Sequence, residues 1–162
     1  MKPPPTYVKV AQYAVGVPGD VLATLGLGSC VAILLRDPVA RVGGMAHVLL
    51  PEPALARDDG NPFKFAQTAV PELIAELRRE GARAARIEGR LVGGAAMFAT
   101  LMVPGTLNMG ERNIRAAREA LVRAGIPLHG EDVGGDYGRS VRFRVDDGSV
   151  TVSSVGRPDV VL

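Results

Sequence analysis

Cysteine, tryptophan and cofactor-binding motifs are scarce or missing in this chain. The sequence has one cysteine, two histidines and no tryptophan among 162 residues. A lone thiol excludes an internal disulfide, and one cysteine with two distant histidines does not make a zinc site. There is no phosphate-binding loop, and Val31 stands where a dinucleotide fingerprint beginning at Gly26 needs its third glycine. The residues therefore predict neither a metal ion nor an organic cofactor.

Long apolar runs and dense basic runs are also missing from the sequence. The longest nearly apolar stretch, 91–103, falls well short of the roughly 20 residues that span a bilayer. The 19 Lys and Arg residues are spread along the chain among 17 Asp and Glu, which argues against nucleic-acid binding. Residues 1–6 show no sign of a secretory signal. With one free thiol, these absences predict a cytoplasmic protein without membrane insertion.

The chain does have the composition of a globular protein. Hydrophobic residues make up 47% and charged residues 22%, while aromatic residues make up only 4%. Valine, leucine, alanine, isoleucine and methionine must therefore fill the core. A length of 162 residues suits one domain, which we expect to extend over 1–162.

Two segments, 62–80 and 109–124, have the helical spacing of apolar residues. Asn61 and Asn108 precede them as caps, and Pro71 is expected to kink or split the first helix. Seven other segments favour β-strands: 21–25, 30–35, 42–50, 85–92, 126–133, 140–145 and 149–155. Runs of strands with only two helices among them predict an α+β fold, in which the helices pack against a sheet layer.

The single cysteine follows a run of small residues and precedes a histidine on the next predicted strand. A cysteine nucleophile needs a base and backbone donors that stabilise an oxyanion. Gly28 and Ser29 leave space and backbone amides directly before Cys30, and His47 is the candidate base, which would lower the pKa of the thiol. Thr24, before the glycine turn, is a candidate for orienting the imidazole.

A structural interpretation of these residues stays open beside the catalytic one. A lone cysteine that opens an apolar run, as Cys30 does, is more often buried packing than a catalyst. His129 is interpreted as a structural or surface residue. Gly93 and Gly94 predict either close backbone packing or a wall of the pocket, and packing is the preferred interpretation.

Several motifs follow one another in an order that resembles one family, the chemoreceptor glutamine deamidases called CheD. The resemblance extends over about residues 7–155 and departs from the pattern at Phe65 and Gln67, where many members carry Tyr and Asp. The motifs are Thr24-Leu-Gly-Leu-Gly-Ser-Cys30, Arg36-Asp-Pro38, Gly43-Gly-Met-Ala-His-Val-Leu-Leu-Pro51, Lys64-Phe-Ala66, Gly93-Gly-Ala-Ala-Met97, Met109-Gly-Glu-Arg-Asn113, and Asp132-Val-Gly-Gly135 followed by Gly138-Arg139.

The resemblance implies a fold, a reaction and a site. The fold would be layered α+β, with packed mixed β-sheets and two main helices on one outer face, similar to deamidating toxins of the cytotoxic necrotizing factor type. The reaction would be that of a protein-glutamine glutaminase acting on methyl-accepting chemotaxis receptors through a thioester, with no cofactor. The catalytic triad would be Cys30, His47 and Thr24, with Gly28 and Ser29 at the oxyanion pocket.

Two other functions remain open at this point. The protein could act as an adaptor that binds the receptor or the phosphatase CheC, stimulating CheC with little catalysis of its own. It could also be a cysteine amidohydrolase with a small-molecule substrate, in which case the site should be a closed pocket and not an open, shallow one.

Overall fold

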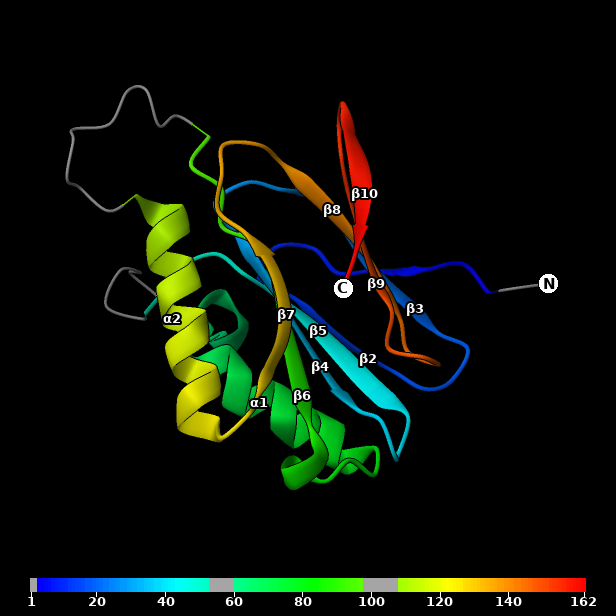
Figure 1. The fold of residues 1–162 in the computed structure, drawn as a ribbon. Coiled ribbons are helices and arrows are strands. Elements are labelled where there is room, and N and C mark those ends of the chain that lie inside the picture. Colours follow the sequence, from blue (N-terminus) through cyan, green and yellow to red (C-terminus); the bar gives the residue numbers. More distant parts are fainter. Residues whose placement is uncertain (1–2, 53–59, 98–107) are drawn as a thin grey trace.

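Two five-stranded sheets form the body of the protein (Figure 1). The structure is a computed structural model that describes residues 3–52, 60–97 and 108–162. In order across the first sheet lie β1 (Thr6–Tyr7), β3 (Val21–Leu27), β8 (Arg139–Arg144), β9 (Val150–Ser154) and β10 (Arg157–Val161). In order across the second sheet lie β2 (Tyr13–Gly16), β5 (Val42–Val48), β4 (Val31–Asp37), β6 (Glu88–Gly93) and β7 (Leu128–Val133).

Both sheets are mixed, since each combines antiparallel pairs with one parallel pair. The parallel pairs are β1 with β3 and β6 with β7. The other elements are η2 (Pro62–Lys64), α1 (Ala66–Arg79), η3 (Ala84–Arg86) and α2 (Met109–Ala124). No helix within the described ranges has the length and apolar character of a membrane span.

Two hydrophobic clusters hold these layers together. One combines the buried faces of α1 and α2 with side chains from β4, β5 and β6, so both helices cover the outer face of the second sheet. The other fills the space between the two sheets and includes Leu22, Met45 and Phe143. The predicted α+β class, the packed mixed sheets and the placement of both helices on one outer face are thereby confirmed.

The helix predicted over 62–80 is broken, but not where expected. Asn61 caps the short η2, because its Oδ1 accepts a hydrogen bond from the N–H of Phe63 at 2.9 Å. The backbone is then extended at Phe65, whose side chain is buried in the core, and α1 begins at Ala66. Pro71 lies inside α1, which continues to Arg79. The prediction for Pro71 was a kink or a split; no split occurs there, and burial of Phe65 accounts for the break upstream.

The remaining predictions agree with the structure to within a few residues. Helix 109–124 is confirmed, with the N–H of Glu111 donating to Asn108 Oδ1 at 2.9 Å and Gly125 in the left-handed conformation. The strand predicted over 85–92 begins only at Glu88, after η3. Three strands were not predicted, β1, β2 and β10, because they are short or largely exposed and lack a regular apolar pattern.

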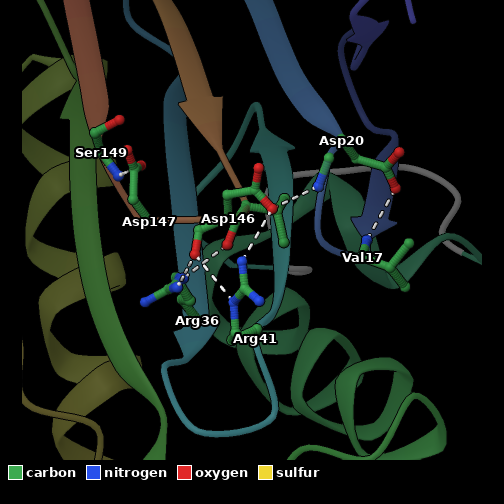
Figure 2. A network of polar contacts seen from close by, with 9 residues as sticks. Val17, Asp20, Arg36, Arg41, Asp146, Asp147 and Ser149 are labelled. Carbon is green, nitrogen blue, oxygen red and sulfur yellow. Dashed lines mark hydrogen bonds and ion pairs between the residues drawn. The ribbon is translucent and has the colours of Figure 1, made fainter. Parts of the chain in front are cut away.

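A buried arginine connects the two sheets at one end (Figure 2). Arg36, on β4, donates from Nε to the carbonyl of Val145 at 3.0 Å and from Nη2 to the carbonyl of Asp146 at 2.6 Å. The carboxylate of Asp146 in turn accepts from the Gly19 N–H at 2.7 Å and from Arg41 at 3.3 Å. We call this set of contacts the arginine tie.

Candidate active site

Thr24 and His47 meet across the gap between the sheets. Thr24 lies on β3 and His47 on β5, and their side chains are 2% and 4% exposed. Thr24 Oγ1 lies 2.9 Å from His47 Nδ1 and 2.6 Å from the carbonyl oxygen of Val8, to which it donates. The predicted partnership of threonine and histidine is thus present in the structure as a hydrogen bond.

This geometry defines which nitrogen of His47 is protonated. A hydroxyl group has one proton, and Thr24 gives it to Val8, so Oγ1 can only accept from Nδ1–H. In a neutral imidazole the lone pair then lies on Nε2. Nε2 is buried and has no hydrogen-bond partner among the described residues. His47 therefore presents an unoccupied basic nitrogen.

Cys30 lies on the same face of the second sheet as His47. The register of β4 and β5 pairs Ala32 with His47, and Cys30 is two residues before Ala32. Cys30 directly precedes β4, and Ala32 belongs to the cluster between the sheets against which Cys30 also packs. Cys30 is half-buried and packs against the cluster between the sheets. The structure does not join its thiol to Nε2 by a hydrogen bond.

Burial favours the neutral forms of both groups. Desolvation raises the pKa of the Cys30 thiol, although the backbone N–H of Cys30 itself opposes that shift. Desolvation also lowers the pKa of the His47 imidazole, against a smaller opposing effect of the Val8 carbonyl. The sequence argument expected an ion pair that lowers the thiol pKa. In this structure the thiol is not hydrogen-bonded to the imidazole, and burial raises the pKa of the thiol instead of lowering it.

The turn that carries the cysteine is held through its carbonyl groups. Gly28 accepts from the N–H of Ala95 at 2.9 Å, and Cys30 accepts from the N–H of Gly94 at 2.8 Å. The carbonyl between them, that of Ser29, accepts from the side chain of Asn113 at 2.9 Å. These hydrogen bonds fix the orientations of three consecutive peptide groups. The N–H groups of Ser29 and Cys30 belong to two of these peptide groups, so their directions are fixed as well.

The two glycines after β6 allow the backbone to approach Cys30. Gly93 has a φ of +113°, and a β-carbon there would lie 2.3 Å from the carbonyl oxygen of Cys30. A β-carbon on Gly94 would lie 2.3 Å from a side-chain carbon of Ile114. No side chain fits at either position, so the preferred prediction of close backbone packing is confirmed.

Two hollows lie beside these residues. One, of about 360 Å³, is lined by Tyr7, Val8, Lys9, Val10, Thr24, Leu25 and His47. The other, of about 250 Å³, is lined by Ser29, Ala95, Ala96, Met97, Asn108, Met109 and Gly110. Threonine and histidine thus line the first hollow, and Ser29, in the turn before the cysteine, lines the second.

Asn113 and His129 have partners that sequence reasoning did not foresee. In the sequence, the only signal that marks Asn113 is its place at the end of the motif Met109-Gly-Glu-Arg-Asn113. His129 lies 2.5 Å from a carboxylate oxygen of Glu88 and is 45% exposed, so its interpretation as a surface or structural residue is confirmed. The described residues contain no group of three or more His, Cys, Asp or Glu side chains placed to hold a metal ion.

Sequence comparison identifies the family. The model of the family described as CheD chemotactic sensory transduction matches residues 49–154. The chain is also 44% identical to the chemoreceptor glutamine deamidase CheD of Thermotoga maritima, in an alignment that covers 92% of this chain and 91% of that protein. The chain belongs to the CheD family. Probable CheD proteins from Caldanaerobacter subterraneus subsp. tengcongensis and Moorella thermoacetica are 45% and 41% identical, over 84% and 100% of this chain and 84% and 98% of theirs.

Solved structures give a more distant likeness for this CheD-family chain. The YfiH protein of Bacillus licheniformis and YlmD of Geobacillus stearothermophilus both align with a TM-score of 0.46, at 20% and 16% identity. The alignments cover 74% and 75% of this chain, which spans about half the length of each of those proteins.

Proposed function

We propose that this CheD-family protein is a protein-glutamine glutaminase that converts glutamine side chains of chemoreceptors to glutamate. The observation that carries the proposal is the buried His47, oriented by Thr24 at Nδ1 and free at Nε2, on the face that bears Cys30. Orientation of one ring nitrogen with the other left open is what a general base beside a nucleophile requires. The names of the curated relatives support the choice of substrate.

In the first half of the reaction Cys30 attacks the substrate amide. The Cys30 thiol gives its proton to Nε2 of His47, and the thiolate forms a bond to the carboxamide carbon. The imidazolium then returns a proton to the amide nitrogen, the carbon–nitrogen bond breaks, and ammonia leaves a thioester on Cys30. Because Thr24 accepts the Nδ1–H, it holds the ring in one orientation through both proton transfers.

In the second half water replaces the thiol. Nε2 takes a proton from water, whose oxygen attacks the thioester carbon, and the carbon–sulfur bond then breaks as the proton passes back to the Cys30 sulfur. The products are glutamate and the free thiol, so no oxidant or cofactor is consumed. The raised pKa of the Cys30 thiol and the lowered pKa of the His47 imidazole, both caused mainly by burial, agree with a proton transfer that accompanies attack on the bound substrate.

The oxyanion of each tetrahedral intermediate needs nearby donors. We assign this role to the backbone N–H groups of Ser29 and Cys30, whose turn is held by the bonds to Ala95, Asn113 and Gly94. We assign Gly28 to the same pocket. A β-carbon on Gly28 would lie 3.5 Å from a side-chain carbon of Met97, so a side chain at this position would narrow the access of the substrate to the turn.

The test is mass mapping of a recombinant chemoreceptor cytoplasmic fragment after incubation with the protein, with Cys30→Ala as the control variant. Conversion of glutamine to glutamate at defined sites, seen only with the intact thiol, is the expected result. Retained binding without conversion by the wild type would favour the adaptor function, and release of ammonia from free glutamine would favour a small-molecule amidohydrolase. Conversion by Cys30→Ala would remove the covalent mechanism.

Other features implied by the resemblance belong to the same proposal. They are binding to the phosphatase CheC, a fold likeness to deamidating toxins, a cytoplasmic location and a single domain over 1–162. The open hollows beside Thr24 and Ser29 support a macromolecular substrate, because neither encloses a small molecule in the way of a closed pocket.

A further inference from the structure

Asn113 is a fully buried polar side chain in the first half of α2. Its Nδ2 donates to the carbonyl of Ser29 at 2.9 Å and to the carbonyl of Leu49 at 3.0 Å. Carbonyl oxygens only accept hydrogen bonds, so the amide nitrogen must face both of them and the orientation of the amide group is fixed. Both of its N–H donors are thereby used, while Oδ1 is buried without a partner among the described residues.

The two carbonyls belong to the two halves of the proposed site. Ser29 directly precedes Cys30, and Leu49 follows His47 by two residues, just after the end of β5. A single side chain on α2 therefore bridges the turn that carries the nucleophile and the strand that carries the base.

The bond to Ser29 also sets the direction of a proposed oxyanion donor. A trans peptide is planar, so the carbonyl of Ser29 and the N–H of Cys30 point in opposite directions. Asn113 holds that carbonyl toward α2, which turns the Cys30 N–H away from the helix. On the other side of the cysteine, the N–H of Gly94 holds the Cys30 carbonyl at 2.8 Å.

The helix is itself firmly placed against this turn. A β-carbon on Gly110 would lie 2.5 Å from the carbonyl oxygens of Gly94 and Ala95, so the first turn of α2 is in close backbone contact with the segment that binds Cys30. Asn108 caps the same turn. Asn113 thus projects from a rigid support, as a group that orients catalytic residues should.

We propose that Asn113 is a positioning residue of the deamidase, which aligns the Cys30 thiol and its backbone N–H with Nε2 of His47. The proposal rests on the function proposed above and deepens it. A side chain that only stabilised the fold would affect the fraction of folded protein, whereas a positioning residue affects the reactivity of Cys30 in the folded molecules.

The experiment compares Asn113→Asp and Asn113→Leu, which keep the branched shape of the asparagine side chain, with Leu121→Ala. Leu121 is buried two turns further along α2 and packs near Gly89, away from the cysteine turn, so its truncation weakens the same helix without touching the bridge. Three quantities are measured on folded protein: kcat and KM for deamidation of the receptor fragment, and the rate of Cys30 alkylation by iodoacetamide as a function of pH.

We expect both Asn113 variants to lose about 10- to 100-fold in kcat, with little change in KM and a displaced pH profile of alkylation. Leu121→Ala should keep the kcat and the profile of the wild type once its folded fraction is taken into account. The same kcat and profile in the Asn113 variants as in Leu121→Ala would overturn the proposal.

The outcomes separate this inference from the proposed function. If the wild type deamidates no receptor, the proposed function fails, while the alkylation profiles still test the effect of Asn113 on the thiol. If neither Asn113 variant folds, the wild type is used, labelled with ¹⁵N. Alkylation of Cys30 should then shift the side-chain NH₂ resonances of Asn113 and leave those of Asn61 in place, and an unshifted Asn113 would overturn the proposal.

Discussion

Two buried polar contacts cross between the sheets, and they differ in how completely their atoms are paired. In the arginine tie, Arg36 places Nε and Nη2 on two carbonyl oxygens (Figure 2). Four residues from Arg36 along β4 lies Ala32, which pairs with His47 on β5. The His47 side chain makes the second contact, a hydrogen bond to Thr24 on the other sheet. That second contact ends in Nε2, a buried nitrogen without a partner in the described structure.

This difference in pairing agrees with a structural role for the first contact and with the catalytic role proposed for the second. Burying an unpaired polar nitrogen costs about 1–3 kcal/mol, whereas a paired one contributes to stability. The side chain of Arg36 also packs directly against Gly148. A β-carbon on Gly148, which has a φ of +78°, would lie 2.9 Å from Arg36 Cδ, so a larger residue there would displace the arginine. Stability alone would favour pairing Nε2 or replacing His47 by an apolar residue. The open nitrogen is consistent with a group kept free to exchange a proton.

Removal of the arginine tie should give the largest change, and the change should be in stability. In Arg36→Met the carbonyls of Val145 and Asp146 lose their buried donors, so we expect the free energy of unfolding to fall by about 3 kcal/mol. Urea titration measures this loss. The kcat of the folded fraction should stay that of the wild type, and a large fall in kcat would show that the arginine tie also orders the active site.

Removal of the Thr24 hydroxyl should give the opposite pattern. Thr24→Val keeps the shape of the side chain but leaves Nδ1–H of His47 without its acceptor. We expect kcat to fall about 10- to 100-fold, less than the roughly 10⁴-fold cost of a wrong imidazole tautomer in a serine protease, because a hydroxyl orients the ring less firmly than a carboxylate.

Steady-state kinetics on the receptor fragment measure this effect, with urea titration of the same variant beside it. The loss of stability should be about 1 kcal/mol, since one buried hydrogen bond to Val8 is removed as well. If KM rises while kcat is kept, Thr24 contacts the substrate and does not orient the base.

The two contacts also differ in how far the sequence predicted them. Cys30, His47 and Thr24 were proposed as a group because their residue types suit a nucleophile, a base and an orienting hydroxyl. The structure adds the hydrogen bond between Thr24 and His47 and the shared face with Cys30. The role of Arg36 had no such signal, since an arginine on a strand reads as solvent-exposed until the partner carbonyls, more than a hundred residues away, are brought beside it.

Asn113 and Phe65 show the same limit on sequence reasoning. The helical spacing and caps that predict α2 are local, and its bounds were predicted correctly, but the bonds of Asn113 to Ser29 and Leu49 exist only after α2 packs on the second sheet. Pro71 was expected to kink or split α1 on local grounds, whereas the break occurs where Phe65 enters the core. Tertiary packing decided both cases, and no local pattern carries that information.

The smallest effect we expect is a dependence of stability on pH that comes from His47. Burial lowers the pKa of this imidazole below its ordinary value of 6.5, so as the pH falls below 6.5 the unfolded chain binds a proton that the folded protein does not. The free energy of unfolding should therefore fall as the pH falls through the window below 6.5.

Comparison with His47→Gln isolates this contribution, because the variant changes only this residue and retains His129 and all carboxylates. Urea titrations from pH 7.5 to pH 5 should show a steeper fall in the wild type than in His47→Gln. Equal slopes would mean that His47 binds its proton as readily in the folded protein as in the unfolded chain. The unpaired Nε2 would then carry no measurable cost of burial, and the contrast with Arg36, whose Nε and Nη2 both donate to carbonyl oxygens, would lose its physical basis.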